Sequence, residues 1–383
     1  IDNLSIYVHW PWCKVKCPYC DFNSHLNSDN ISYDDMLKGY KKDIEKSYKL
    51  VGKRNILSIF FGGGTPSLMS PKILKEIINY IEIFWTLDEK VEITLEANPR
   101  DINYSLMKEF KDIGINRVSI GVQSFNENEL VFLGRNHSAG ESINSIEIAN
   151  KIFKKVSFDL ISTLPDASVE KWEKNLKFAL TLIKNHISIY QLTIEKGTKF
   201  FSMYKNKKFL LPKEELSLKI FNLTNEILFQ HNLYAYEVSN YSFKNYESIH
   251  NKAIWNYKDY IGIGPGAHSR IKIKNNFYAI NMDYNPKIWL MNNKIYKNNF
   301  ANRILLSPKE TIEEIIIMGL RLNKGINLIE AERRINLNIL NNLNNDVLEK
   351  AIKEELLVIK KGHLKTTSSG LNVLNALTSS LLS

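Results

Sequence analysis

The chain has 383 residues, of which 44% are hydrophobic and 24% charged, and its formal net charge is +10. This composition excludes a disordered chain, and the length predicts two or three domains. No apolar run approaches the roughly 20 residues of a membrane span, and residues 1–8 lack the features of a secretory signal. Lysines mix with glutamates and no nucleic-acid-binding motif occurs, so we expect no nucleic-acid partner.

From the N-terminus, short runs rich in Ile, Val and Phe alternate with helical patterns. We predict strands at 4–9, 56–61, 91–96, 117–122, 156–161 and 186–193, and helices at 33–51, 71–84, 103–113 and 169–183. This alternation is typical of parallel strands joined by right-handed crossovers. Six such units predict an α/β fold with a partial (β/α)6 barrel over residues 1–235.

Beyond residue 212 the pattern changes. A long helix is predicted at 212–229 and a strand at 236–242, and residues 256–270 are rich in glycine. We interpret 236–305 as a connecting region. Residues 306–383 are mainly helical and include a hairpin-like turn at Lys361–Gly362, which predicts a winged-helix-like C-terminal domain.

Polar residues follow the apolar strands. The second strand leads into "GGGTPS", the third ends at Glu96, the fourth reaches Gln123 with Arg135 shortly after, and the fifth carries Asp159. Ligands of parallel α/β folds bind at the carboxyl ends of the strands, so these residues predict a site at one rim. Each residue alone is equally explained by a structural hydrogen bond.

All three cysteines of the chain, Cys13, Cys17 and Cys20, lie in one loop after the first strand. An odd, clustered count is a poor disulfide framework and indicates a reducing compartment, which we take to be the cytoplasm. A zinc site completed by His9 or His25 is one interpretation. The other is a 4Fe–4S cluster, which normally takes four cysteines and would here keep one iron open.

The spacing Cys-x3-Cys-x2-Cys, with Tyr19 before the last cysteine, is identified as the signature of the radical S-adenosylmethionine enzymes. The segments "YVHWPWCKVKCPYCDFNSH", "FFGGGTPS", "ISIGVQSF", "LGRNH" and "GIGPGAHS" resemble the HemW haem chaperones, relatives of the oxygen-independent coproporphyrinogen III oxidase HemN. The resemblance covers nearly the whole chain. It implies that the three cysteines hold a 4Fe–4S cluster whose open iron binds S-adenosylmethionine.

The resemblance also implies roles for the residues of the rim. Tyr7 would lie beside the cluster and Tyr19 near the adenine of the cofactor. The remaining cofactor contacts that it implies are Gly64, Thr65, Glu96, Gln123, Arg135 and Asp159. Arg135 is the best carboxylate clamp among them, because its planar fork binds bidentately.

One departure and one shared motif distinguish the two activities of these relatives. The oxidase carries a further cysteine where this chain has Phe22, which favours the chaperone. The chaperones share a His-Asn-x-x-Tyr-Trp motif linked to haem. The segment "HNKAIW" matches it at His250, Asn251 and Trp255, while Ile254 replaces the tyrosine. The resemblance thus implies His250 as an axial haem ligand and Trp255 as a stacking partner; a histidine that only hydrogen-bonds within its loop is the alternative.

We therefore predict a radical S-adenosylmethionine-type haem chaperone that binds haem and transfers it to an acceptor protein. The sequence does not identify the acceptor protein. A membrane-bound acceptor is compatible with this prediction. A coproporphyrinogen oxidase and a zinc-stabilised winged-helix binding protein are the alternatives.

Overall fold

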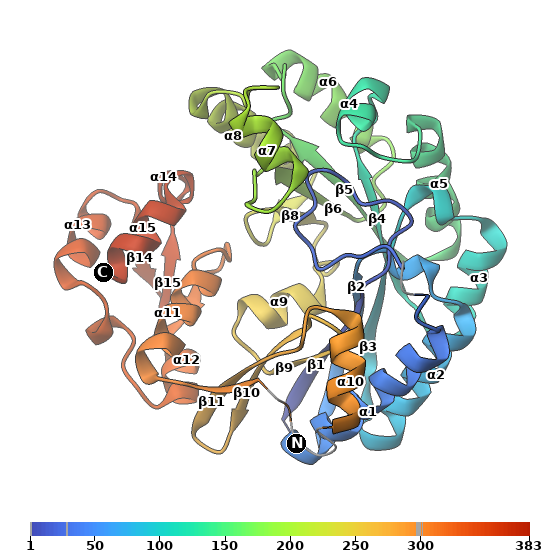
Figure 1. The fold of residues 1–383 in the computed structure, drawn as a ribbon. Helices are drawn as coiled ribbons and strands as arrows, with labels where there is room; N and C mark the ends of the chain where they lie inside the picture. Colours follow the sequence, from blue (N-terminus) through green and yellow to red (C-terminus); the bar gives the residue numbers. More distant parts are fainter. Residues whose placement is uncertain (1, 28–29, 296–299, 301) are drawn as a thin grey trace.

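The computed structural model describes residues 2–27, 30–295, 300 and 302–383 (Figure 1). Five positions of the predicted connecting region, 296–299 and 301, lie outside this description. The described residues form one 12-stranded mixed sheet and one three-stranded sheet in the C-terminal part. No helix among them is both long and apolar enough to cross a membrane.

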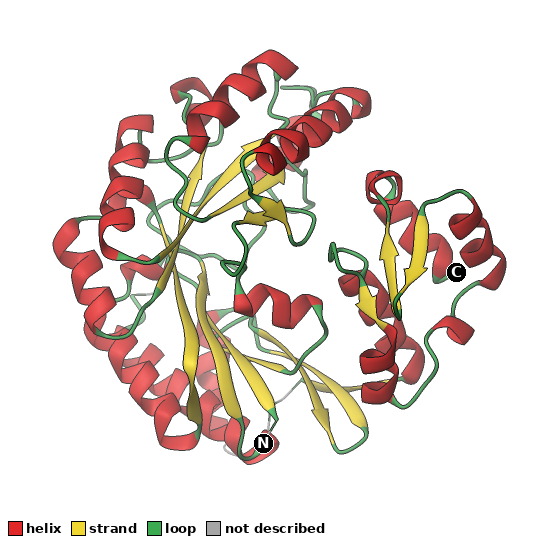
Figure 2. Cartoon of the chain, turned by 180° about the vertical axis from the view of Figure 1, so that it is seen from behind, coloured by secondary structure: helices red, strands yellow, loops and turns green. Residues whose placement is uncertain are grey.

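Six neighbouring strands of the large sheet run parallel and follow chain order, which confirms the predicted partial barrel. They are β1 (Asn3–Trp10), β2 (Asn55–Gly63), β3 (Thr86–Ala97), β4 (Arg117–Gln123), β5 (Lys155–Ser162) and β6 (His186–Gln191). The helices between them lie on the outer side of the sheet (Figures 1 and 2). They are α1 (Tyr33–Val51), α2 (Pro71–Phe84), α3 (Tyr104–Asp112), α4 (Glu127–Phe132), α5 (Ala139–Ile152) and α6 (Val169–Leu180).

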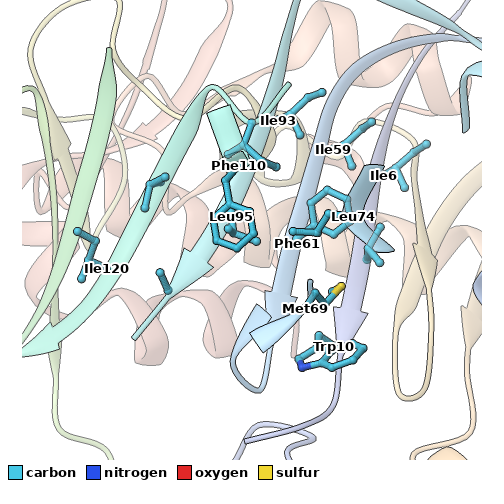
Figure 3. Packing of buried hydrophobic residues seen from close by; sticks show 14 of the residues in the cluster. Ile6, Trp10, Ile59, Phe61, Met69, Leu74, Ile93, Leu95, Phe110 and Ile120 are labelled. Atoms are coloured by element: carbon cyan, nitrogen blue, oxygen red, sulfur yellow. The ribbon is translucent and has the colours of Figure 1, made fainter. Parts of the chain in front are cut away.

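The outer face of these strands forms the main apolar core. Ile6, Ile59 and Leu95 point toward the helices and are almost fully buried (Figure 3). Helix α2 fits this face because Ser70 accepts the Ile73 N–H, Pro71 suits the first turn, and its apolar residues form one stripe. Alternate residues of each strand therefore point into the barrel.

The inner face is polar. Ser5 of β1 pairs in register with Ser58 of β2, and Ser119 of β4 with Ser157 of β5. Thr94 of β3 also lies on this face and is buried. Small hydroxyl side chains leave room inside the barrel, and they cannot form an apolar core there.

The segment after β6 begins with α7 (Lys199–Lys205), α8 (Glu214–Gln230) and β7 (Tyr234–Ala235), and the predicted connecting region then supplies five further strands of the same sheet. Strand β8 (Asn240–Ser242) pairs with β6, and β9 (Tyr260–Ile263) pairs in parallel with β1. Beyond β9 the sheet continues antiparallel with β10 (His268–Ile273), β11 (Asn276–Asn281) and β12 (Arg303–Leu306), and α10 (Pro286–Ile295) lies between the last two. Helix α9 (Ile249–Trp255) lies between the barrel and the C-terminal part (Figure 1).

The C-terminal part combines helices with a small sheet, as predicted. Its helices are α11 (Pro308–Gly319), α12 (Leu328–Ile335), α13 (Asn345–Lys353), α14 (Ser368–Asn372) and α15 (Leu374–Leu381), and its strands are β13 (Ile326–Asn327), β14 (Leu357–Lys360) and β15 (His363–Thr366). The hairpin between β14 and β15 turns at Lys361–Gly362, which confirms that prediction. Tyr257 and Phe277, from outside this part, belong to its apolar cluster.

Candidate functional site

The predicted polar residues meet at the carboxyl ends of the parallel strands. The backbone N–H of Gly63 donates to Glu96 Oε2 at 3.2 Å. A side chain at Gly62 would touch both Tyr7 and Glu96, so these two residues adjoin across β1, β2 and β3. We call this set, with Asp159, Gln123 and Arg135, the strand-end rim.

The two carboxyl groups of the rim, those of Glu96 and Asp159, have few neighbours that would stabilise their charged forms. Burial and the neighbouring Asp159 raise the pKa of Glu96 to about 8. Burial raises the pKa of Asp159 to about 6, against hydrogen bonds from Ser188 and Ser119. Neither carboxyl group forms a salt bridge within the described part of the chain. A cationic ligand placed between them would favour their ionised forms.

Arg135 holds the cysteine loop to the rim. One Nη donates to Cys17 Sγ at 3.4 Å and to the Tyr19 hydroxyl at 3.3 Å, and the other donates to the Gly121 carbonyl at 2.7 Å. Its Nε is buried without a partner. The structure shows Arg135 in contact with Cys17 and Tyr19, so it positions both residues. The bidentate carboxylate contact suggested by the sequence stays a prediction.

Each cysteine is half-buried and has its own polar neighbour. Thr65 Oγ1 donates to Cys13 Sγ at 3.4 Å, and Cys20 Sγ lies 3.8 Å from Ser24 Oγ. Burial raises the pKa of the Cys13 and Cys20 thiols, partly against these hydrogen bonds. Among the described residues no three His, Cys, Asp or Glu side chains are grouped so that they could hold a single metal ion, whereas each thiolate of a 4Fe–4S cluster binds an iron of its own.

The glycines of "GGGTPS" let the cysteine loop approach β2. A Cβ at Gly64 would lie 2.6 Å from the Trp12 carbonyl oxygen, and one at Gly63 would lie 2.6 Å from the His9 ring. The Gly64 N–H donates to the Trp10 carbonyl and the Thr65 N–H to the Trp12 carbonyl. The absence of Cβ thus serves a close approach of two backbone segments, while the predicted cofactor contact of Gly64 stays a prediction.

Gln123 ends β4 in a left-handed conformation, with φ of 72°. This conformation is uncommon for a residue with a side chain, and such residues gather at functional sites. The Gln123 amide lies close to Arg135, since a Cβ at Gly121 would touch both side chains. Gln123 therefore belongs to the rim.

The two predicted haem residues are separated. His250 is 3% exposed and faces the barrel interior, where its ring lies 4.9 Å from that of Phe60. Trp255, at the other end of α9, stacks with the Arg321 guanidinium at 4.7 Å. Five positions along a helix turn the side chain by about 140°. The structure therefore does not bring His250 and Trp255 to one surface.

The imidazole of His250 has one partnered and one free nitrogen. Nδ1 lies 2.9 Å from Ser58 Oγ, whose own proton is donated to Ser5 Oγ at 2.9 Å. The tautomer with its proton on Nδ1 fits this chain of hydrogen bonds and leaves the lone pair on Nε2. Nε2 is buried without a partner. Burial lowers the pKa of His250 to about 4, which keeps the ring neutral.

Sequence reasoning missed Glu92, whose side chain is 0% exposed. Its carboxylate accepts from Arg117 and Lys155, and from Ser248 Oγ and the Ile249 and His250 N–H groups. It thereby anchors the first turn of α9 inside the barrel. A signal existed in the alternation of β3, since Glu92 and Glu96 fall on the same face.

Sequence reasoning named His9 only as a possible zinc ligand, and it missed Asn23. His9 Nδ1 lies 3.0 Å from the Tyr7 hydroxyl, and its Nε2 lies 2.8 Å from the Asn23 carbonyl. The Asn23 side chain donates to the Pro265 carbonyl. These contacts tie the end of the cysteine loop to β1 and to the glycine-rich segment. Both residues lie in the segment "YVHWPWCKVKCPYCDFNSH", which was the signal available in the sequence.

Comparisons with known proteins agree with this geometry. The Radical SAM superfamily profile matches residues 7–179, and the HemN C-terminal domain profile matches residues 306–373. The chain is 34% identical to the protein named Heme chaperone HemW of Buchnera aphidicola from Acyrthosiphon pisum, over 98% of both chains. It is 36% identical to the mitochondrial Radical S-adenosyl methionine domain-containing protein 1 of Danio rerio, over 85% of this chain and 74% of that one.

A solved structure shows the same fold. Coproporphyrinogen III oxidase (HemN) from Escherichia coli superposes with a TM-score of 0.81 over 99% of this chain and 90% of that one, at 19% identity. This likeness confirms the fold class, the partial barrel with its helical C-terminal domain.

The radical SAM superfamily implies a 4Fe–4S cluster and S-adenosylmethionine. The residues present fit both groups. One loop supplies three thiols and the chain has no fourth cysteine, so an iron would stay open for the cofactor. At the same rim, the Glu96 and Asp159 carboxyl groups form no salt bridge with any described residue, and S-adenosylmethionine carries an ammonium and a sulfonium. On these motifs, this fold and its near full-length relatives, the chain belongs to the HemW haem chaperone family of the radical SAM superfamily.

Proposed function

We propose that this protein binds haem and passes it to an acceptor protein. The observation that carries the proposal is the sequence identity of 34–37% with proteins named Heme chaperone HemW. Two of these matches cover 98% of both chains. Phe22, at the position of the further cysteine of the oxidase, supports a chaperone over an oxidase. The three free thiols support a reducing compartment, and we place the activity in the cytoplasm.

His250 Nε2 is the haem ligand in this proposal. A neutral imidazole with a free lone pair is a competent axial ligand, and a hydrogen bond at the other nitrogen fixes its tautomer and orientation. Ser58 supplies that bond at Nδ1. Nε2 has no competing partner, which supports the assignment.

Haem reaches this nitrogen only when α9 moves outward, because the imidazole is sealed in the barrel. Two residues with left-handed backbones, Asn245 with φ of 73° and Tyr257 with φ of 53°, flank the helix. They are natural hinge positions, since small changes of backbone angle at the ends of a segment move it as a body. The free and haem-bound chains therefore differ in the position of α9.

Trp255 links this helix to the C-terminal part. Its indole contacts Arg321, which also pairs with the buried Glu237. After α9 moves, the indole is free to stack on the macrocycle, as the family motif implies. Ile254 precedes it where the family has tyrosine, so this position adds no hydroxyl to the haem site.

Cys13, Cys17 and Cys20 hold the 4Fe–4S cluster in this proposal, and Arg135 keeps Cys17 in place. Tyr7, Tyr19, Gly64, Thr65, Glu96, Gln123 and Asp159 line the S-adenosylmethionine site. The bound cluster supplies an iron with an exchangeable coordination position. Glu96 and Asp159 orient the cofactor through its positive groups, and Gly63 fixes the Glu96 carboxylate.

The test is a hemin titration of the full chain and of His250→Ala, followed at the Soret band. We expect the variant to bind hemin more weakly and with a shifted Soret band, because it loses the coordinate bond. Trp255→Ala should weaken binding less, and Ile254→Tyr should not weaken it. An unchanged spectrum in His250→Ala would show that this histidine is not the ligand.

A second measurement separates chaperone from oxidase. Reconstituted protein is supplied anaerobically with coproporphyrinogen III, S-adenosylmethionine and a reductant. We expect no conversion of the porphyrinogen, and turnover would make the chain an oxidase in spite of Phe22.

A further inference from the structure

A pocket lies between the end of helix α9 and the C-terminal part of the chain. It has about 410 Å³ of empty space, some of which is open to solvent. Residues 255–258 form one wall, and residues of α11, β13, α12 and the turn after α11 form the other. Small molecules bind preferentially at such junctions between domains. We call this space the hinge pocket, because Tyr257 lines it and is one of the two hinge positions of α9.

The wall that the C-terminal part contributes is mostly apolar. The buried side chains of Ile315, Leu322 and Ile326 belong to it. The Trp255 indole lines the pocket from the side of α9, and the Arg321 guanidinium lies 4.7 Å from the centre of its ring. Ligand sites are typically lined by apolar and aromatic side chains of this kind, which pack against a flat ring. The hinge pocket therefore suits a small aromatic group.

The polar groups of the hinge pocket offer unused hydrogen-bond donors. Lys258 pairs with Glu330, and one Nη of Arg334 pairs with Asp259. The other Nη of Arg334 and the indole N–H of Trp255 have no hydrogen-bond partner among the described residues. The lining residues carry two positive charges, on Lys258 and Arg334, against the one negative charge of Glu330. Guanidinium donors favour a planar anion, above all a carboxylate.

The hinge pocket offers no ligand for the iron of haem. Its lining residues include no histidine, cysteine or methionine. The hydroxyl of Tyr257, which is the remaining type of iron ligand, already donates to Glu314 at 2.7 Å. The imidazole of His250 faces the barrel interior and not this pocket. The pocket is therefore a site distinct from the one that holds the haem iron.

We propose that the hinge pocket binds a small aromatic carboxylate, with its ring against Trp255 and its carboxylate on Arg334 and Lys258. Such an occupant bridges α9 and the C-terminal part, so it holds α9 in its present position. Outward movement of α9 would carry Trp255 away and divide the pocket. The occupant and haem then favour different positions of α9, and each weakens the binding of the other by the same factor. Binding in the pocket stands on the pocket alone, whereas this coupling rests on the proposed function.

The first experiment titrates the haem-free full chain with benzoate and with benzamide, followed by calorimetry. Benzamide has nearly the same shape but no charge. We expect benzoate to bind about ten-fold more tightly or better, because a hydrogen bond between charged groups contributes more than a neutral one. Arg334→Gln should abolish this preference. Arg333→Gln is the matched control on the same helix, since Arg333 is exposed and does not line the pocket.

A second variant fills the pocket without breaking an ion pair. Ala331 lines the pocket from α12 and is partly buried, so the larger side chain of Ala331→Leu would take the place of the ligand ring. We expect benzoate to bind about ten-fold more weakly or worse to this variant, because ring and leucine cannot share the space. Circular dichroism shows that the variant is folded. Equal benzoate affinity in Ala331→Leu, Arg334→Gln and the unchanged chain would overturn the proposal.

The coupling is measured with saturating benzoate. Hydrogen exchange in residues 249–255 of the haem-free chain should slow, because the occupant holds α9 in place. Hemin should bind about five-fold more weakly or worse, and benzoate should bind the hemin-loaded chain more weakly by the same factor. Benzamide should cause neither change.

The outcomes separate the hinge pocket from the proposed function. Benzoate binding with slower exchange but unchanged hemin affinity would support the pocket and refute the outward movement of α9. A loss of hemin binding in Ala331→Leu, measured without benzoate, would make the pocket a haem site and would overturn the proposal.

Discussion

Two glutamates of strand β3, four residues apart, mark two different ends of the barrel interior. Glu92 lies at the closed end, and two cations and three donors of the α9 segment hold its pKa below the usual value in spite of burial. Glu96 lies at the open rim with one backbone N–H and a second carboxyl group nearby, and its pKa is raised to about 8. A satisfied buried carboxylate builds the fold, and an unsatisfied one indicates a place for a ligand.

The largest effect is expected where the open rim meets the cysteine loop. Cys17→Ala removes one of three thiolates and should abolish the Fe–S absorbance after anaerobic reconstitution, with loss of iron and sulfide together. The fold should persist, since Cys17 is half-buried in a loop. Phe22→Ala, two positions after the last cysteine, is the control and should keep the cluster. Stoichiometric zinc without sulfide in the unchanged chain would contradict the cluster assignment.

Glu92→Gln tests the closed end. Removing one partner of a buried charge pair leaves Arg117, which is 3% exposed, without its counterion. We expect a loss of about 3–5 kcal/mol in the free energy of unfolding, measured by urea denaturation. Glu96→Gln, on the same strand, should not destabilise the ligand-free chain. An equal loss of unfolding free energy in both variants would show that Glu92 and Glu96 do not differ in their contribution to the fold.

Gly64→Ala tests the approach of the cysteine loop to β2. The new Cβ would lie 2.6 Å from the Trp12 carbonyl oxygen, so one backbone must shift. Overpacking of this kind costs about 1–3 kcal/mol, and we expect weaker cluster assembly as well. Gly140→Ala on α5, where the nearest atom is 3.8 Å away, should be neutral or slightly stabilising. Normal stability and cluster content in Gly64→Ala would show that the loop adapts.

The smallest effect concerns the pH dependence of stability. The folded chain keeps a proton on Glu96 from its ordinary pKa up to about 8, whereas the unfolded chain has lost it. The folded state thus binds more protons in this window, and its stability falls as pH rises through it. Glu96→Gln should remove this part of the slope in urea titrations between pH 5 and 8, roughly the span of the shift. S-adenosylmethionine should flatten the slope in the unchanged chain.

Much of the fold and of the rim could be predicted. The strands are short, apolar and separated by capped helices, and the ends of parallel strands must meet, so Glu96, Gln123 and Asp159 could be assigned to one rim. The role of Arg135 could not, because its partner Cys17 is 118 positions away. The burial of His250 was equally hidden, since it depends on Glu92 and Ser58, which are far from α9 in the chain.

Tyr257 and Phe277 have a consequence for synthesis on the ribosome. Both side chains are buried in the apolar cluster of the C-terminal part, although they precede it in the chain. While residues 306–383 are still being made, these rings have no core to enter and stay in contact with water. The growing chain therefore exposes two buried aromatic rings until residues 306–383 have left the ribosome and can fold around them.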